Sequence, residues 1–252
     1  RGGWPGSIDL PLAEASLLPK EYVKAIVEDD VYRMDGIKRD TNKMRLLLRS
    51  LARNESTTVT NRTLKNDVKE IDDEDIDANT INEYLNIFER LFLINNQKPF
   101  AASVRSSVRI KQAVKRHFVD PSISAALLGV TSSSLLNDLE TLGLLFEALC
   151  ERDLQIYADA FGGSLYHYQD YKNREIDAVV ECPDGEWCAF AIKLGANQID
   201  AAAEGLLRLK AEFEADPRGR PPKVLCVLCG LSNAAYQRPD GVFVVPLTAL
   251  RD

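Results

Sequence analysis

The spacing of apolar residues changes from helical to strand-like in the second half of the chain, and this change most restricts the possible folds. Leucines recur every three to four residues from 135 to 149, which predicts a long amphipathic helix. The elements expected after it are three strands, a second helix and two buried strands: 164–171, 175–182, 186–194, 201–213, 224–229 and 242–245. The order αβββαβ with a further strand predicts an α/β sandwich.

The segment 20–100 carries helical spacing instead, and Gly36 separates its first two helices. Asn79 or Thr80 is expected to cap a third helix, which has an apolar stripe from Ile81 to Leu91. The residues 92–100 look like the strand and turn that begin a wing, and a short strand at 114–119 and a turn at Pro121 follow. This order predicts a winged-helix module, which would place its last helix in a DNA groove or serve as a protein-docking module.

The charge of the chain limits how it could meet nucleic acid. A formal net charge of -7 and a pI near 5.1 exclude coating of nucleic acid through bulk positive charge, so any contact must be local. One stretch without acidic residues supplies candidate phosphate contacts: Lys98, Arg105, Arg109, Lys111, Lys115 and Arg116. The alternative is a solvated strand and loop, and the acidic residues 67–77 before the third helix would repel phosphate.

Apolar runs, the first residues and the cysteines indicate the cellular compartment of the protein. The apolar runs are too short for a membrane span, and the start at Arg1 has neither an initiator Met nor a signal sequence, so we expect a cytoplasmic fragment of a longer protein that does not contact a membrane. Five cysteines fit a reducing compartment. Cys226 and Cys229 form one C-x-x-C inside an apolar run, and we expect core cysteines rather than zinc ligands. His117 is expected to pack or lie at the surface, and His167 to be structural.

The predicted strands bring charged residues together. Asp177 alternates with apolar residues in the second strand, so its side chain should project from the sheet on the same face as Glu175. In the third strand, 191 and 193 share a face, and Lys193 could stand beside Asp177. Carboxylates around a hard cation are what metal-dependent phosphodiester cleavage requires. A simple ion pair between neighbouring strands is the alternative.

These residues carry a resemblance to known families. The stretch from 141 to about 209 resembles the PD-(D/E)XK nuclease superfamily, whose motif places Asp on one strand and Glu-x-Lys on the next. The whole chain resembles the C-terminal region, a domain of unknown function, that follows the AAA ATPase module in a large bacterial and archaeal ATP-binding family. The signatures are the runs 91–94, 115–120, 143–147, 174–177 and 192–195.

The resemblance implies roles for particular residues. Glu147, on the long helix, and Asp177 would be Mg or Mn ligands, and Lys193 would orient water or stabilise charge. The alternative is that Glu147 is only a solvated helix residue. Ala191 departs from the pattern, because it stands where the motif has Glu and cannot bind metal or water. The chain should therefore be a poor nuclease as written. Either Ala191 is natural and the fold persists as a binding platform, or it silences an active protein; the survival of the other three residues favours the second explanation.

The expected organisation is a junction with a missing ATPase module at 1–19, a winged-helix-like domain at 20–120 and a PD-(D/E)XK nuclease-like domain at 121–252. No Gly-x-x-x-x-Gly-Lys-Ser/Thr occurs, so ATP would bind the parent ATPase domain rather than this chain. The expected partners are DNA and that N-terminal ATPase domain. The alternatives are a non-catalytic interaction or homo-oligomerisation module of the ATPase, and a restriction-like effector that cuts foreign DNA.

Overall fold

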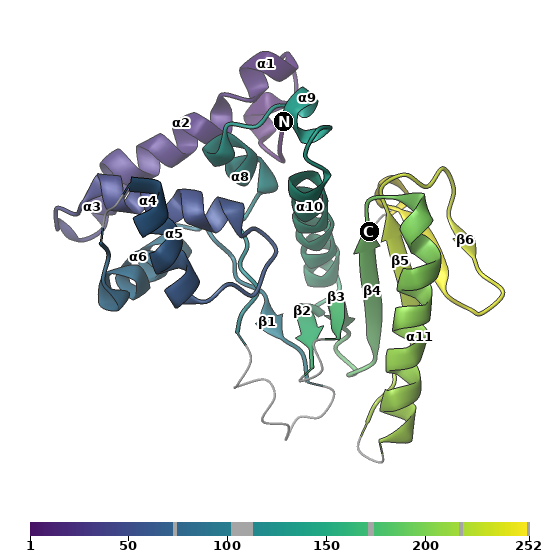
Figure 1. Ribbon diagram of the computed structural model, residues 1–252. Coiled ribbons are helices and arrows are strands. Elements are labelled where there is room, and N and C mark those ends of the chain that lie inside the picture. The colour runs from purple at the N-terminus through teal and green to yellow at the C-terminus, as the bar shows by residue number, and fades with distance from the viewer. Residues whose placement is uncertain (73–74, 102–112, 171–173, 217–218, 251–252) are drawn as a thin grey trace. The chain divides into compact units, whose positions relative to one another are not determined.

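The computed structural model describes residues 1–72, 75–101, 113–170, 174–216 and 219–250 (Figure 1). The chain divides into two compact units, and each is made of two stretches of sequence. The first unit comprises Arg1–Asn96 and Lys115–Ala148, and the second comprises Gln97–Val114 and Leu149–Asp252. The first is helical and the second contains a mixed sheet, so the chain is a mixed α/β protein. No helix among the described residues is long and apolar enough to cross a membrane.

The first unit contains short and long helices. In chain order these are η1 Pro5–Ser7, α1 Leu12–Ala15, α2 Leu18–Ala25, the π-helical turn η2 Ile26–Asp30, α3 Val31–Asp35, α4 Thr41–Arg53, α5 Asn61–Asp72, α6 Ala78–Arg90, α8 Pro121–Leu128, α9 Ser132–Leu135 and the beginning of α10 Leu139–Ala160. Gly36 ends α3 in a left-handed conformation with φ 71°, as its position between two helical patterns predicted.

Aspartates begin the two longest of the early helices. Asp40 caps α4 by accepting hydrogen bonds from the backbone N–H groups of Asn42 and Lys43 at 2.9 and 3.1 Å. Asp77 caps α6 in the same way, where Asn79 or Thr80 was expected. The expected cap was wrong because the N–H groups of Asn79 and Thr80 are themselves the donors to Asp77. The N-cap residue directly precedes the first helical residue, and its side chain accepts hydrogen bonds from backbone N–H groups two and three residues later.

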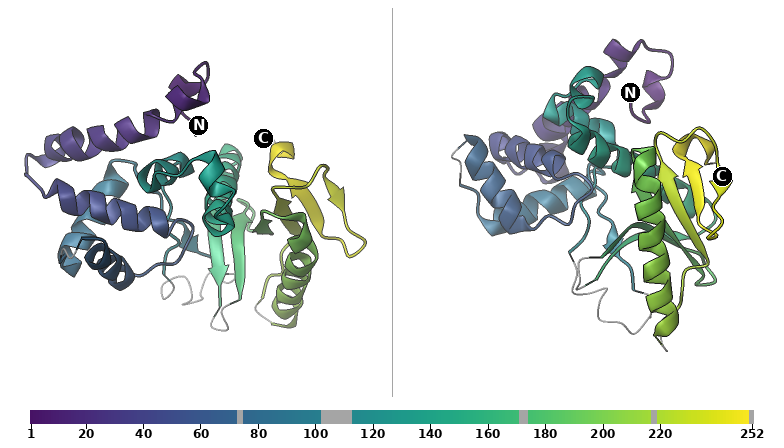
Figure 2. Two further views of the ribbon diagram at one scale, coloured as in Figure 1. Left: turned by 45° about the horizontal axis from the view of Figure 1, so that its top comes forward. Right: turned by 45° about the vertical axis from the view of Figure 1, so that its right-hand side comes forward.

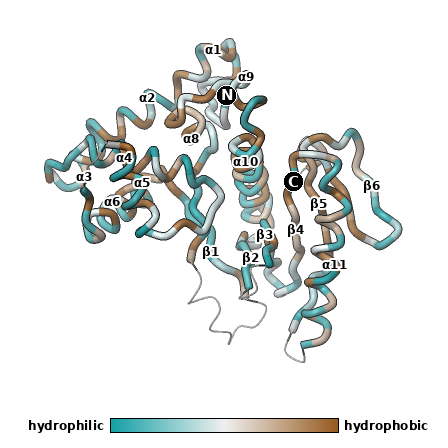
Figure 3. The backbone as a smooth tube through the Cα atoms, viewed as in Figure 1, coloured by the Kyte–Doolittle hydropathy of each residue, from teal (hydrophilic) through white to brown (hydrophobic). Residues whose placement is uncertain are grey.

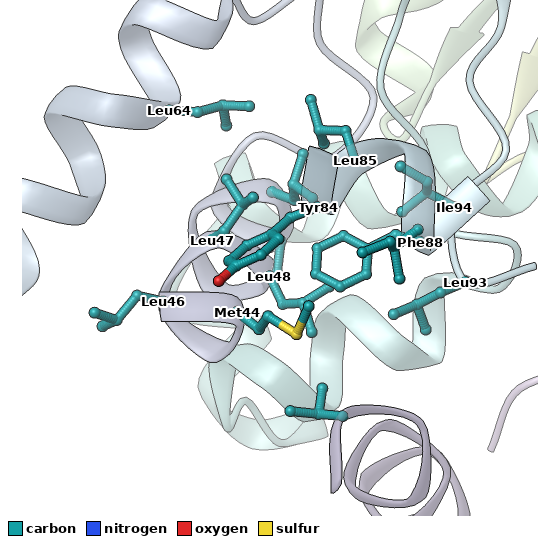
Figure 4. Close-up of a cluster of buried hydrophobic side chains, with 14 of the residues drawn as sticks. Met44, Leu46, Leu47, Leu48, Leu64, Tyr84, Leu85, Phe88, Leu93 and Ile94 are labelled. Atoms are coloured by element: carbon teal, nitrogen blue, oxygen red, sulfur yellow. The ribbon is translucent and has the colours of Figure 1, made fainter. Parts of the chain in front are cut away.

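The core of the first unit is mainly aliphatic and includes the aromatic rings of Tyr84, Phe88 and Phe118. Met44, Leu47 and Leu48 of α4 meet Phe88 of α6 and Leu93 in a fully buried cluster (Figure 4). The apolar positions of α4 and α6 recur at three and four residues, which is the spacing that places them on one side of each helix. The sequence pattern of both helices therefore predicted the side that is buried.

The segment after α6 differs from the predicted wing. Among its described residues, the part of this segment in the first unit forms isolated antiparallel bridges, between Ile94 and Phe118 and between Thr57 and Arg116. The strand expected at 114–119 is reduced to these bridges. Pro121 begins α8 rather than a turn, since Asp120 caps that helix and proline is favoured in a first helical turn.

The second unit contains a seven-stranded sheet in the order β1-β2-β3-β4-β5-β7-β6. Its elements are β1 Lys98–Pro99, the rest of α10, β2 Ser164–Gln169, β3 Glu175–Glu181, β4 Trp187–Lys193, η3 Ala196–Gln198, α11 Ile199–Ala215, β5 Val224–Cys229, β6 Tyr236–Gln237, β7 Phe243–Pro246 and η4 Leu247–Ala249. β2, β3 and β4 are antiparallel neighbours, whereas β5 runs parallel to β4 and β7. The predicted order of helices and strands after residue 135 is confirmed.

Helix α11 covers one face of this sheet (Figure 2, right). Its buried residues Ile199, Ala203 and Leu206 recur at helical spacing, and hydrophobic and hydrophilic residues alternate along it in Figure 3. They belong to one buried cluster with alternate residues of β4 and β5, such as Ala189 and Val227. Every strand residue from Leu225 to Cys229 is buried, so the prediction of a strand covered on both faces and of core cysteines is confirmed there. The same prediction for 242–245 was wrong, because Phe243 of β7 is 38% exposed.

Candidate functional site

The end of β4 brings Asp177 and Lys193 into contact. Lys193 Nζ lies 2.9 Å from Asp177 Oδ2, and the backbone N–H of Ile192 donates to the same oxygen at 2.7 Å. The Asp177 side chain is 12% exposed and that of Lys193 is 31% exposed. Lys193 therefore stands beside Asp177, as the strand pattern predicted. The Asp177 carboxylate accepts hydrogen bonds from the Lys193 ammonium group and from a backbone amide.

The strand register explains why the Asp177 side chain, rather than a backbone carbonyl, accepts the hydrogen bond from the Ile192 N–H. β3 and β4 pair from Glu181 opposite Trp187 to Ala178 opposite Phe190. Continuing this antiparallel count would place Ile192 opposite Ile176, but the paired residues stop at Ala178 and Phe190. The Asp177 carboxylate accepts the hydrogen bond that a carbonyl of β3 would otherwise receive. Asp177 thus stabilises the β4 backbone where the two strands separate.

Ala191 lies on the same face as Asp177. Val179 pairs with Ala189, and side chains alternate along each strand, so Asp177 and Ala191 lie on that same face just beyond the last paired residues. Ala191 is 7% exposed and belongs to the buried apolar cluster that contains Ile199 and Ala203 of α11. Position 191 thus carries only a methyl group, on the buried face of β4.

Glu147 is paired with a lysine in the first unit. Lys115 Nζ donates a hydrogen bond to Glu147 Oε1, and the two side chains are 9% and 18% exposed. Lys115 was expected to contact phosphate, whereas in the structure its ammonium group lies against a carboxylate. Glu147 belongs to the first unit, whereas Asp177 and Lys193 belong to the second.

The remaining residues of the basic stretch have different surroundings. Arg105, Arg109 and Lys111 lie outside the described residues. Arg116 donates from Nη2 to Asn61 Oδ1 at 2.9 Å. Burial lowers the pKa of the Arg116 guanidinium, and the nearby Glu89 carboxylate opposes that shift. Arg116 therefore contacts the beginning of α5, and its Nε has no hydrogen-bond partner among the described atoms.

A second buried polar cluster surrounds Glu55 in the first unit. Its carboxylate is 1% exposed and accepts hydrogen bonds from the Phe118 N–H at 3.1 Å and from the Ser124 hydroxyl. His117 Nδ1 lies 3.4 Å from the same carboxylate, and the His117 side chain is buried rather than at the surface. His167 is buried in β2. The hydrogen bond between Ser124 and Glu55 joins α8 to the residues that follow α4. Because the Ser124 side chain is fully buried, its hydroxyl is not accessible as a nucleophile.

The carboxylates that the resemblance assigns to a metal do not fit one as they stand. Among the described residues, no group of three or more His, Cys, Asp or Glu side chains could hold a metal ion. Glu147 and Asp177 each contact a lysine of their own unit, and Ala191 supplies no oxygen. A Mg or Mn ion prefers several oxygen ligands, and an ammonium group already at the carboxylate opposes its binding. The arrangement suits ion pairing and hydrogen bonding.

Sequence reasoning missed two features. The hydrogen bond from Ile192 to Asp177 involves a backbone group and leaves no mark in a residue pattern. The second is a row of exposed arginines on α4, at 45, 49 and 53. Its signal was present, because residues four apart lie on one side of a helix.

These units define a mixed α/β protein with a helical N-terminal part and a C-terminal part that contains a mixed sheet. A family model described as Domain of unknown function (DUF8612) matches residues 1–134, which is 134 of the 252 residues, and the chain belongs to that family. A model described as Domain of unknown function (DUF4143) matches residues 142–250. Neither the curated proteins nor the solved structures that were compared include a match.

Proposed function

We propose that the chain is the C-terminal part of an AAA-type ATP-binding protein, in which a winged-helix-like module and a PD-(D/E)XK-like domain bind DNA without cutting it. The element order α10, β2, β3, β4, α11, β5 agrees with the order that the nuclease resemblance implies. The match of residues 142–250 to a domain of unknown function agrees with the other resemblance. ATP-driven movement of the ATPase module would then act on DNA held by these domains.

The surroundings of Asp177 carry the proposal that the domain does not cut. This carboxylate accepts hydrogen bonds from Lys193 and from the β4 backbone, and Ala191 lies on the same face of the neighbouring strand. Phosphodiester cleavage by a metal ion needs several carboxylate oxygens around the ion to hold it and to activate water. With one such side chain replaced by a methyl group, the end of β4 lacks the ligands for that reaction.

A cleavage assay with substitutions at position 191 tests this proposal. The chain itself should leave single- and double-stranded DNA intact with Mg or Mn. Ala191→Glu should gain metal-dependent cleavage, because it adds a carboxylate on the face of the sheet that carries Asp177. Ala191→Gln has nearly the same size without the charge and should gain none. Position 191 is buried, so circular dichroism must first show that both variants are folded.

The double variant Ala191→Glu/Asp177→Asn separates the proposed site from a contaminating nuclease. Cleavage by Ala191→Glu should disappear in the double variant, since Asn offers only one weak oxygen ligand. Cleavage by the unaltered chain would contradict the proposal. So would a folded Ala191→Glu that binds DNA but cuts neither single- nor double-stranded substrates with Mg or Mn.

A second candidate is a docking or oligomerisation module of the ATPase, and exposed apolar residues favour it. In the first unit Ile8, Leu12, Leu17, Leu136 and Leu139 are each more than half exposed. Exposed apolar residues beyond scattered single ones are typical of protein interfaces. DNA binding that weakens steeply with added salt would support the first candidate, and no binding at low salt together with self-association would support the second.

A further inference from the structure

Helix α4 presents a row of arginines on its exposed side. Thr41–Arg53 has buried apolar residues on one side, and its exposed residues beyond the first turn are Arg45, Arg49 and Arg53. An interval of four residues advances about 6 Å along a helix axis, so the three side chains follow one another along the helix. Figure 4 shows the opposite, apolar side of α4, with Met44 and Leu47 directed toward the core.

The charge of α4 contrasts with that of the chain. The helix contains four basic residues and no acidic one, in a protein with a net charge of -7. Arg45 forms an ion pair with Glu28 at 2.6 Å, and both side chains are almost half exposed. Arg49 and Arg53 form no hydrogen bond or ion pair with the described residues. Two guanidinium groups of this row are therefore available to an anionic partner.

Helix stability explains only part of this pattern. Arg53 lies in the last turn, where a positive charge interacts favourably with the helix dipole. Arg49 lies before that turn and gains little from the same effect. Exposed helix faces usually mix acidic and basic residues, which support one another at intervals of four. A face with only arginines instead complements a partner with regularly repeated negative charge.

We propose that α4 binds the phosphate backbone of nucleic acid through Arg49 and Arg53, and that Arg45 strengthens this contact when it exchanges Glu28 for phosphate. This inference rests on the proposed DNA-binding function and adds a surface distinct from the basic stretch at 105–116. Guanidinium groups form paired hydrogen bonds with phosphate oxygens, and their regular spacing suits a polymer of phosphates. The contact is independent of base sequence, because phosphates are the same at every nucleotide.

The salt dependence of DNA binding tests this inference on the full chain. The affinity for a fluorescent 25-base-pair duplex is measured by anisotropy at several salt concentrations. Arg49→Gln/Arg53→Gln keeps helix-forming side chains but removes two charges. The slope of log affinity against log salt should become shallower by about 1.8, since each neutralised phosphate contributes about 0.9. At fixed low salt the affinity itself should fall at least tenfold.

Two further variants control for charge and for helix stability. Lys24→Gln/Arg208→Gln removes two exposed charges from α2 and α11, and it should leave the slope unchanged. Arg49→Lys/Arg53→Lys keeps both charges and should retain most of the slope. Circular dichroism confirms that each variant remains helical.

The outcomes separate this inference from the proposed function. If the unaltered chain does not bind the duplex or a single strand even at low salt, the proposed DNA-binding function fails. If it binds and Arg49→Gln/Arg53→Gln leaves the slope unchanged, only the role of α4 is wrong. Binding of polyglutamate, but not of DNA, that depends on Arg49 and Arg53 would assign α4 to an acidic protein and overturn the inference.

Discussion

The two lysine–carboxylate pairs have the same chemistry in different surroundings. Lys115 and Glu147 are both mostly buried in the first unit, with 9% and 18% of their side chains exposed. Lys193 is 31% exposed in the second unit, and its partner Asp177 also accepts a backbone N–H. The comparison shows that the first pair is the more buried of the two by its lysine, whereas the carboxylate of the second pair also accepts a hydrogen bond from a strand.

The largest expected effect comes from Lys115→Met. Breaking a buried ion pair on one side leaves an uncompensated charge, which costs about 3 kcal/mol or more. We expect the first unit to lose about 3 kcal/mol of unfolding free energy. Each unit contains one of the two tryptophans, Trp4 and Trp187, so urea unfolding of the first unit can be followed by fluorescence in a Trp187→Phe background.

The double variant Lys115→Met/Glu147→Leu is the control for this prediction. It removes both charges and keeps apolar volume, so most of the lost stability should return. If the single and double variants are equally unstable, the pair does not neutralise a buried charge, and the contrast with Asp177 disappears.

In the second unit, Asp177→Ala should cost less, about 2 kcal/mol, because it removes a charge-assisted hydrogen bond to the Ile192 N–H. Asp177→Asn keeps an oxygen acceptor and should cost about half as much. Urea unfolding followed through Trp187 in a Trp4→Phe background measures both variants. Equal losses for Ala and Asn would show that the charge of Lys193, rather than the strand amide, dominates.

Thiol labelling sharpens the comparison, because all five cysteines lie in the second unit. Burial raises the pKa of Cys188 to about 11 and that of Cys226 to about 12. At pH 8 only about one Cys188 thiol in a thousand is then ionised, so alkylation is slow and accelerates about tenfold per pH unit. Asp177→Ala should accelerate labelling of Cys226, and Lys115→Met should not. Mass spectrometry of alkylated peptides identifies each site.

The smallest effect is expected for Asp35, an exposed residue of the first unit whose partner Arg39 is largely buried. A hydrogen bond from Arg39 lowers the pKa of Asp35 to about 2, from its ordinary 3.8. A carboxyl whose folded pKa is lowered adds stability above its unfolded pKa, and that stability is lost as the pH falls toward 2. Asp35→Asn should therefore show a slightly shallower decline of melting temperature between pH 4 and pH 2. An unchanged decline would mean that solvent screens this pair completely.

The sequence predicted the elements better than the contacts. Apolar spacing located α10 and the strands, because burial of one face leaves a regular pattern. The alternation around Asp177 and Lys193 likewise predicted their proximity. The pairing of Lys115 with Glu147 joins residues 32 positions apart that no periodicity connects. The two-residue strand Lys98–Pro99 is too short to carry a period, so the segment was assigned to a wing although it pairs with β2.

Each unit is made of two separate stretches of sequence, which limits where the chain can be divided into fragments that fold. The polypeptide passes from one unit to the other three times, after Asn96, Val114 and Ala148. Severing it between the two family matches, at 134–142, would give a first fragment that carries β1 away from its neighbour β2 and a second that removes Glu147 from Lys115. Each fragment would lack residues that complete its own fold, so gene fusions should keep the two matched segments in one polypeptide.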